Sequence, residues 1–351
     1  MRETEAGVTP RAAPRAAILG CAGPVLDADE RRFMAEADPT GFILFRRNCE
    51  TPEQVRALIT ALREAVARPD APVLIDQEGG RVARLGSPHW RVPPAPALFG
   101  ALAKIDETAG ARAAWLNARL VAADLYPLGI TVNCVPMLDL RFVEASAVIG
   151  DRSFGADPHT VIRLGRAVVD GLHAGGVLPA IKHLPGHGRA AADSHAVLPR
   201  VDASLASLRA HDFVPFQALR DVPAGLTSHV CYTALDAEQP GTLSKAVIGE
   251  AVRSAIGFDG LLFSDDLSMG ALTGPIGERA RAALAAGCDL ALHCNGNRDE
   301  MEDVAAAVPR LEGRARNRVD LMLASRHEPD PFDQADGRRE LEALLARVST
   351  P

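Results

Sequence analysis

The sequence lacks long apolar runs and clusters of basic residues. None of its apolar stretches approaches the roughly 18 consecutive residues that a membrane-spanning helix needs, so no membrane association is expected. Its 38 lysines and arginines are outnumbered by 45 acidic residues and form no basic run. A nucleic-acid partner is therefore not expected either. The cytoplasm is the expected location, and a monomer or weak homodimer is the expected state.

Paired cysteines and nucleotide-binding motifs are also missing. The six cysteines include no CxxC pair, and most of them lie in apolar runs. This pattern predicts small buried residues in a reducing compartment and excludes a disulfide framework. No GxGxxG or GxxxxGK[ST] follows an apolar run, so a nucleotide cofactor is not expected. We expect no cofactor.

Eight short apolar runs alternate with longer stretches of helical spacing along almost the whole chain. The apolar runs cover residues 17–19, 41–45, 73–75, 131–138, 177–181, 225–228, 260–263 and 289–293. The expected helices cover residues 29–37, 52–66, 108–126, 159–174, 205–219, 245–256, 277–286 and 299–311, with a short one at 338–347. Such alternation predicts an α/β protein with a parallel sheet.

Eight repeats favour a closed (β/α)₈ TIM barrel over an open, doubly wound sheet. We expect one domain, with a flexible tail over residues 1–15 and the catalytic barrel over residues 16–325. Residues 326–351 would form an extension packed on the outside of the barrel. In such barrels the chemistry lies at the carboxyl ends of the strands.

Polar residues gather at those strand ends. Asp76 and Arg84 follow the third run, Arg152 lies in the loop after the fourth, and Lys182 follows the fifth. Arginine and lysine offer only hydrogen-bond donors and aspartate only acceptors, and a polyol ligand needs both. An alternative for Arg152 is a simple ion pair with its neighbour Asp151.

The fifth run leads into the richest segment, residues 182–195, which contains three histidines. His183 and His187 flank a proline and a glycine, which exclude a helix and predict a shaped loop. Asp193 lies two residues before His195, where a carboxylate would fix the imidazole tautomer. A solvated polar loop, proton-transfer chemistry and metal binding all remain open for this segment.

The pair Asp265-Asp266 directly follows the seventh run. Adjacent side chains on a strand point in opposite directions, so only one carboxylate is expected to face a pocket. That carboxylate would serve as a nucleophile, a base or a metal ligand, unless both cap the following turn. A metal site would combine this pair with Asp193 and the three histidines of residues 182–195.

These blocks together resemble glycoside hydrolase family 3, specifically its compact bacterial β-N-acetylglucosaminidases. The segment K-H-L-P-G-H-G (182–188) followed by D-S-H (193–195) resembles a signature of that family, with Leu184 where phenylalanine is usual. D-Q-E-G-G-R-V-A-R (76–84), V-I-G-D-R-S-F (148–154), F-S-D-D-L-S-M (263–269) and G-F-I-L-F-R-R-N (41–48) match further blocks.

The resemblance implies a role for each site residue. Asp265 would be the catalytic nucleophile, and His195, held by Asp193, would be the general acid/base. The residues that would bind the N-acetylglucosamine ring are Asp76, Arg84, Arg152, Lys182 and His183. No metal would be bound.

The implied activity is that of a retaining exo-β-N-acetylglucosaminidase acting through a covalent glycosyl–aspartate intermediate. The resemblance points to small carbohydrate substrates from peptidoglycan recycling, such as N-acetylglucosamine linked to 1,6-anhydro-N-acetylmuramic acid. The alternatives are a phosphorylase that uses the same residues, a metal-dependent hydrolase and a non-catalytic amino-sugar-binding regulator.

Overall fold

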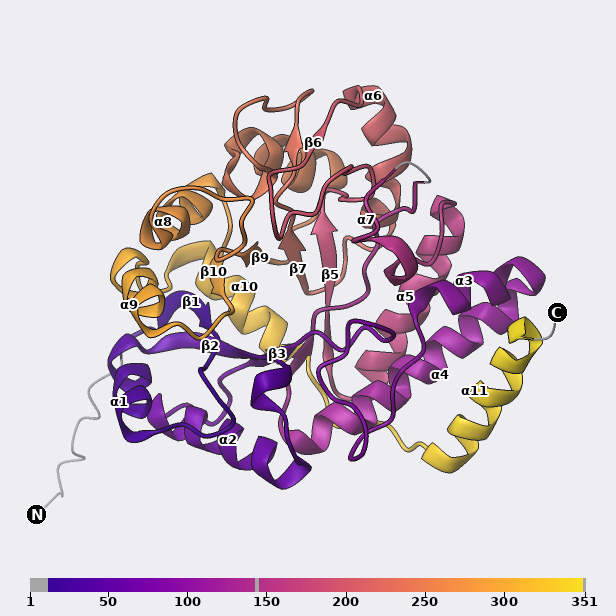
Figure 1. Cartoon of the computed structure of the whole chain (residues 1–351), viewed down its shortest axis with the longest axis horizontal. Helices are drawn as coiled ribbons and strands as arrows, with labels where there is room; N and C mark the ends of the chain where they lie inside the picture. Colours follow the sequence, from indigo (N-terminus) through magenta and orange to yellow (C-terminus); the bar gives the residue numbers. More distant parts are fainter. Residues whose placement is uncertain (1–11, 143–144, 350–351) are drawn as a thin grey trace, which may run out of the picture.

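A computed structural model describes residues 12–142 and 145–349, and it contains a closed barrel of eight parallel strands (Figure 1). Around the barrel the strands follow the order β1-β10-β9-β7-β5-β4-β3-β2. Their bounds are β1 (Arg15–Leu19), β2 (Pro39–Leu44), β3 (Val73–Ile75), β4 (Val132–Asn133), β5 (Leu178–Leu184), β7 (Ala224–Thr227), β9 (Leu261–Asp266) and β10 (Leu290–His293). The predicted (β/α)₈ fold is confirmed.

Helices surround the barrel. Those that follow the strands are α1 (Ala28–Ala37), α2 (Pro52–Ala65), α3 (Pro96–Ile105), α4 (Glu107–Leu125), α5 (Pro158–Ala174), α8 (Ile276–Ala286) and α9 (Arg298–Ala307). Several begin at a side-chain cap: Thr51 accepts a hydrogen bond from the Gln54 amide at 3.2 Å, and Asp157 accepts one from Thr160 at 2.9 Å. These caps satisfy amides that have no partner inside the helix.

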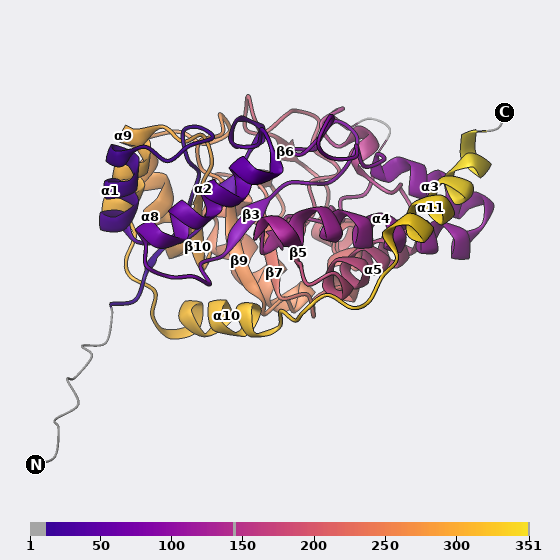
Figure 2. The same cartoon turned by 90° about the horizontal axis from the view of Figure 1, so that it is seen from below.

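Two hydrophobic clusters hold the fold together. The outer one lies between the strands and the surrounding helices. The inner one fills the barrel with alternate strand residues such as Ile18, Leu74 and Phe263. At the amino ends of the strands, Val319 and Met322 of α10 (Gly313–Ala324) pack onto this inner cluster. Figure 2 shows α10 lying across that end, so this helix covers the barrel there.

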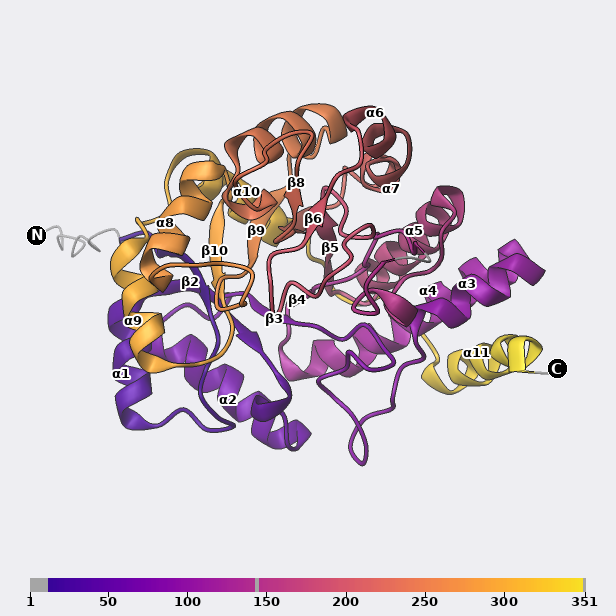
Figure 3. The ribbon, with the colours of Figure 1, turned by 45° about the horizontal axis from the view of Figure 1, so that its top comes forward.

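The end of the chain runs along the outside of the barrel. The last helix, α11 (Gln334–Ser349), packs against α3 and α4 (Figure 3). Arg112 of α4 makes two 2.7 Å hydrogen bonds to Glu340 of α11, and the ring of Phe332 packs edge-on against Trp115. At the other end of the chain, residues 1–11 of the expected tail lie outside the described residues, whereas Arg15 already belongs to β1.

Several expected elements differ from those observed. The expected helix over residues 205–219 is divided into α6 (Leu205–Ser207), a π-helical turn η4 (Leu208–Asp212) and α7 (Val214–Ala218). Pro215 has no N–H and therefore cannot continue one regular helix. The element expected over residues 245–256 is the π-helix η6 (Val247–Ile256). The strand β4 is shorter than expected because Pro136 cannot donate to a sheet.

Other elements were not anticipated. The helices α3 and α10 were missed, and the two short strands β6 (Arg200–Val201) and β8 (Cys231–Tyr232) pair with each other outside the barrel. Within the described residues, no helix combines the length and the apolar character needed to cross a membrane.

Candidate active site

A cavity of about 310 Å³ lies at the carboxyl ends of the strands. Strands β3, β5 and β9, the loops after them and the loop after β4 supply its polar walls. All eight candidate site residues line it, namely Asp76, Arg84, Arg152, Lys182, His183, Asp193, His195 and Asp265. The structure therefore brings together side chains that are up to 189 positions apart in the sequence (265 minus 76).

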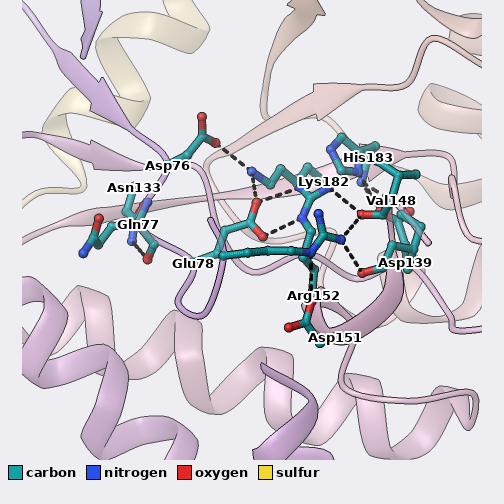
Figure 4. Close-up of polar contacts among 12 residues, drawn as sticks. Asp76, Gln77, Glu78, Asn133, Asp139, Val148, Asp151, Arg152, Lys182 and His183 are labelled. Carbon is teal, nitrogen blue, oxygen red and sulfur yellow. Dashed lines mark hydrogen bonds and ion pairs between the residues drawn. The ribbon is translucent and has the colours of Figure 1, made fainter. Parts of the chain in front are cut away.

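Lys182 forms the centre of a buried group of alternating charges (Figure 4). Its ammonium lies 2.7 Å from Oδ1 of Asp76 and 2.6 Å from Oε1 of Glu78. Burial alone would raise the pKa of both carboxyls, but the neighbouring cations lower the pKa of Asp76 and bring that of Glu78 to about 2. Burial opposes the charge of Lys182, but the two carboxylates raise its pKa above the usual value. All three groups are therefore charged at neutral pH.

Arg152 is fixed by Glu78 and not by Asp151. Its Nε and Nη2 each donate a 2.8 Å hydrogen bond to one oxygen of Glu78, in a bidentate pair. Asp151 instead pairs with Arg81 at 3.0 Å, so the simple alternative of an Arg152–Asp151 pair is wrong. A planar, bidentate pair of this kind holds the guanidinium in one orientation.

The segment after β3 is shaped by amide side chains. Gln77 accepts hydrogen bonds from the amides of Arg84 and Leu85, and Asn133 of β4 bonds both the N–H and the C=O of Gln77. These bonds fold the segment back so that Nη2 of Arg84 lies 3.1 Å from Oδ2 of Asp76. The guanidinium of Arg84 also stacks over the ring of Phe45, with 4.8 Å to its centroid.

His183 is held by the buried carboxylate of Asp139. Nδ1 of the ring lies 2.6 Å from Oδ2, and the amide of His187 donates to Oδ1 at 2.6 Å. Burial raises the pKa of Asp139, but the His183 ring and the donated hydrogen bonds lower it more, so this pKa lies below its usual value. Since Nδ1 is engaged with Asp139, Nε2 is the ring nitrogen left for a ligand.

Asp265 and Asp266 both line the cavity, which corrects the expectation that only one of them would. The reason is that the chain turns directly after them. The carboxylate of Asp266 accepts hydrogen bonds from the amide and hydroxyl of Ser268 at 3.0 and 2.8 Å and from the Cys294 amide at 3.2 Å. Asp266 therefore caps this turn, which is the role that the alternative of turn-capping aspartates gave to it.

Among the residues that the structure describes, the carboxylate of Asp265 accepts one hydrogen bond, from the Asp266 amide at 2.8 Å. Burial would raise the pKa of Asp265, but His229, His183 and that amide outweigh the effect, and its pKa lies below the usual value. A half-buried, ionised carboxylate with free lone pairs in a cavity is suited to nucleophilic attack.

Asp193 and His195 lie together at the edge of the cavity. Oδ1 of Asp193 is 2.7 Å from Nδ1 of His195 and also accepts the His195 amide at 2.9 Å. Burial opposes ionisation, but bonds from the His195 amide and ring lower the pKa of Asp193. The His195 side chain is 65% exposed, so its Nε2 is open to a ligand and to water. This geometry suits proton transfer.

Sequence reasoning left four supporting residues out of the proposed sugar-binding and catalytic set: Glu78, Asp139, His187 and His229. Glu78 lies inside the D-Q-E block and follows a predicted strand end, so the same strand-end pattern contained a signal for it. His229 makes 2.8 Å contacts with Thr242 and with the backbone oxygen of Asp266. Within the described part of the chain, no group of three or more His, Cys, Asp or Glu side chains is arranged to hold a metal ion.

Comparison with known proteins identifies the family of the chain. Residues 19–323 match the N-terminal domain of glycosyl hydrolase family 3. A β-hexosaminidase of Tolumonas auensis is 41% identical over 303 residues, covering 84% of this chain and 85% of the relative. A β-hexosaminidase of Pseudomonas aeruginosa is 38% identical over 332 residues, covering 94% and 96%.

The solved structures lead to the same family. NagZ from Neisseria gonorrhoeae, in complex with N-trifluoroacetyl-D-glucosamine, has a TM-score of 0.83 and 32% identity, covering 97% of this chain and all of that one. A family 3 β-N-acetylglucosaminidase from Paenibacillus has a TM-score of 0.80 and 31% identity, covering 94% of this chain and 66% of that one. The chain belongs to glycosyl hydrolase family 3, and it is a glycoside hydrolase of the β-N-acetylhexosaminidase type.

Proposed function

We propose that the protein is a retaining exo-β-N-acetylglucosaminidase that removes terminal N-acetylglucosamine from small peptidoglycan fragments in the cytoplasm. The observation that carries this proposal is that the ionised Asp265 and the Asp193–His195 pair line one cavity. The N-trifluoroacetyl-D-glucosamine bound to the gonococcal NagZ supports an amino sugar as the ligand. The resemblance to recycling enzymes supports substrates that carry 1,6-anhydro-N-acetylmuramic acid.

The proposed ring-binding residues supply a mixed set of donors and acceptors. Asp76 presents carboxylate oxygens, and Lys182 has one ammonium proton left after its contacts with Asp76 and Glu78. Arg152 and Arg84 add further donors, whereas Nε2 of His183 is an acceptor in the tautomer that carries its proton on Nδ1, towards Asp139. Their mutual ion pairs fix these groups before substrate arrives, so little side-chain entropy is lost on binding.

In the first proposed step, Asp265 attacks the anomeric carbon while the bond to the leaving oxygen breaks. His195, protonated at Nε2, gives its proton to that oxygen, and Asp193 stabilises the imidazolium before the transfer. A covalent glycosyl–Asp265 ester results. In the second step the neutral His195 takes a proton from water, and the resulting hydroxide oxygen attacks the same carbon and releases Asp265.

The histidine stands where most retaining glycosidases use a second carboxylate. Phosphate in place of water would give a glycosyl phosphate and regenerate the same aspartate. Product analysis with and without phosphate separates the hydrolase from this phosphorylase alternative. A sugar-binding regulator without catalysis would show no turnover in the same assay.

The decisive experiment is to trap the intermediate with a 2-deoxy-2-fluoro glycosyl substrate or a related slow substrate. Peptide mass spectrometry should then locate the label on Asp265. The Asp265→Ala variant should turn over an aryl N-acetylglucosaminide at least about 10⁴-fold more slowly than the natural protein. Its unfolding midpoint should stay unchanged. Asp320→Ala, on the exposed face of α10, is the matched control and should stay fully active. A label elsewhere, or near-normal turnover by Asp265→Ala, would refute the assignment.

A further inference from the structure

The loop that carries Asp193 and His195 is anchored through the residue between them. Ser194 is buried, with only 3% of its surface exposed, whereas the His195 side chain beside it points into solvent and the cavity. The aspartate–histidine contact is internal to the loop and does not fix the loop to the barrel. Contacts made by Ser194 and by the loop backbone must therefore determine where His195 lies.

One anchor is the imidazole of His187. Its Nε2 lies 3.2 Å from Oγ of Ser194, and the ring is buried. The amide of His187 donates to Asp139, and its carbonyl accepts the Ala190 amide at 3.0 Å, so the backbone below the ring is also fixed. Burial and the nearby His183 lower the pKa of His187 to about 4, which keeps the ring neutral at neutral pH.

The second anchor is the turn that follows Asp265 and Asp266. The amide of Gly270 donates to the carbonyl of His195, and the amide of Ala271 donates to that of Ser194, both at 3.1 Å. A Cβ atom on Gly270 would lie 2.8 Å from the His195 oxygen and 2.9 Å from the Ala196 oxygen. Only glycine allows the two backbones to approach this closely.

This turn is itself rigidly connected to β9. Met269 donates its amide to the carbonyl of Asp266 at 3.2 Å, and Leu272 donates to that of Met269 at 3.2 Å. From α8, Nη1 of Arg279 reaches the carbonyl of Leu267 at 2.8 Å. The loop with His195 therefore rests on the same turn that Asp265 begins.

We propose that His187 and Gly270 are positioning residues, which hold His195 at a fixed place relative to Asp265 by anchoring Ser194 and the loop backbone. This inference rests on the proposed roles of His195 as acid/base and Asp265 as nucleophile. Neither His187 nor Gly270 exchanges a proton with substrate in this scheme. Loosening either anchor should impair proton donation while leaving Asp265 and the sugar-binding groups intact.

The test uses three variants of the whole protein that loosen an anchor, together with one rescue variant, one control variant and two substrates. Ser194→Ala removes only the hydroxyl that meets His187, His187→Leu removes the ring nitrogen, and Gly270→Ala inserts the clashing methyl group. The substrates are a dinitrophenyl N-acetylglucosaminide, whose leaving group needs no proton, and a methyl N-acetylglucosaminide, whose leaving group does. The quantity compared is kcat/KM, which reports the first step.

For the methyl glycoside we expect losses of about fivefold to tenfold for Ser194→Ala and about 100-fold for Gly270→Ala. For the dinitrophenyl glycoside every variant should stay within about twofold of the natural protein. His187→Gln keeps a polar group near Oγ of Ser194 and should recover part of the loss seen in His187→Leu. Gly249→Ala is the control, because the added methyl would meet no atom within 4 Å beyond its chain neighbours and the adjacent backbone of its own helix.

Equal losses on both substrates, or none, would overturn the proposal, since a merely structural defect does not distinguish leaving groups. Hydrogen exchange gives a second readout that does not depend on the reaction. In Gly270→Ala, amides over residues 193–197 and 270–271 should exchange faster than in the natural protein, while those of β5 and β9 keep their rates. If these amides exchange at unchanged rates in Gly270→Ala, the anchoring is refuted. If the natural protein has no activity but the amides of Gly270→Ala do exchange faster, only the proposed function is refuted.

Discussion

The carboxylate of Asp139 lies 2.6 Å from Nδ1 of His183; both residues are buried, and His183 lines the cavity. A carboxylate in this position fixes the tautomer and the ring plane of the imidazole. Asp139→Asn should therefore weaken binding of N-acetylglucosamine about 10- to 100-fold, as expected for a lost charge-assisted hydrogen bond. Isothermal titration with the free sugar measures this directly.

A double variant tests whether Asp139 acts through His183. If it does, Asp139→Asn combined with His183→Ala should bind the sugar no more weakly than His183→Ala alone. Additive losses would mean that Asp139 contributes by another route, for example by holding the His187 amide.

The second prediction concerns the proposed acid. His195→Ala should reduce kcat/KM strongly for glycosides with poor leaving groups and only slightly for dinitrophenyl glycosides, because only the former need a proton. Asp193→Asn should show the same dependence with smaller losses. Steady-state kinetics over a series of aryl glycosides provide the measurement. If kcat/KM of His195→Ala depended on the acidity of the leaving group as it does in the natural protein, the acid role would be contradicted.

The third prediction links Glu78 to stability. The pKa of Glu78 is lowered from its usual 4.5 to about 2, so the folded protein binds fewer protons than the unfolded chain between these values. Its contribution to the free energy of unfolding is complete above about pH 4.5 and is lost as the pH falls towards 2. Glu78→Gln leaves Lys182 and Arg152 short of one buried counter-charge and should cost about 3–5 kcal/mol at neutral pH.

Denaturant unfolding at a series of pH values checks this link. The difference in unfolding free energy between the natural protein and Glu78→Gln should shrink as the pH falls from 5 to 2. Glu302→Gln, which removes an exposed partner of Arg298, should change stability by less than about 1 kcal/mol. A difference that stays constant with pH would contradict the ion-pair explanation.

The fourth prediction distinguishes this chemistry from metal-dependent hydrolysis. Since the proposed mechanism needs only protein side chains and water, dialysis against a chelator should leave kcat/KM unchanged. Loss of activity on chelation and its recovery with added zinc would instead support a metallohydrolase, the alternative that the three histidines of residues 182–195 raised.

The positions of the site residues were predictable because a parallel barrel has a simple rule. Asp76, Lys182 and Asp265 each follow or end an apolar run, and closing the sheet brings those ends to one side. Their contacts were not predictable. Asp151 adjoins Arg152 in sequence, yet Arg152 pairs with Glu78, which is 74 positions away. The reason is that the loop after β3 folds back over the cavity.

The missed elements have similar physical causes. The helix α3 follows a proline-rich stretch. Nearly all of its residues are apolar, so the sequence shows no alternation of apolar and polar positions that would reveal a helical face. The polar helix α10 gives a weak pattern because it buries only Val319 and Met322 beneath the barrel. The break before α7 did have a local signal in Pro215, which the expectation of one continuous helix over residues 205–219 left out of account.

The alternating charges of Asp76, Lys182, Glu78 and Arg152 also limit how this pocket can evolve. Each of these groups neutralises a buried neighbour, so replacing any one of them leaves a charge without its partner. A lineage changing this pocket one codon at a time would have to pass through a weakened protein. New sugar specificities should therefore arise more readily from the loops at the cavity mouth than from this group of four, which would be inherited as one unit.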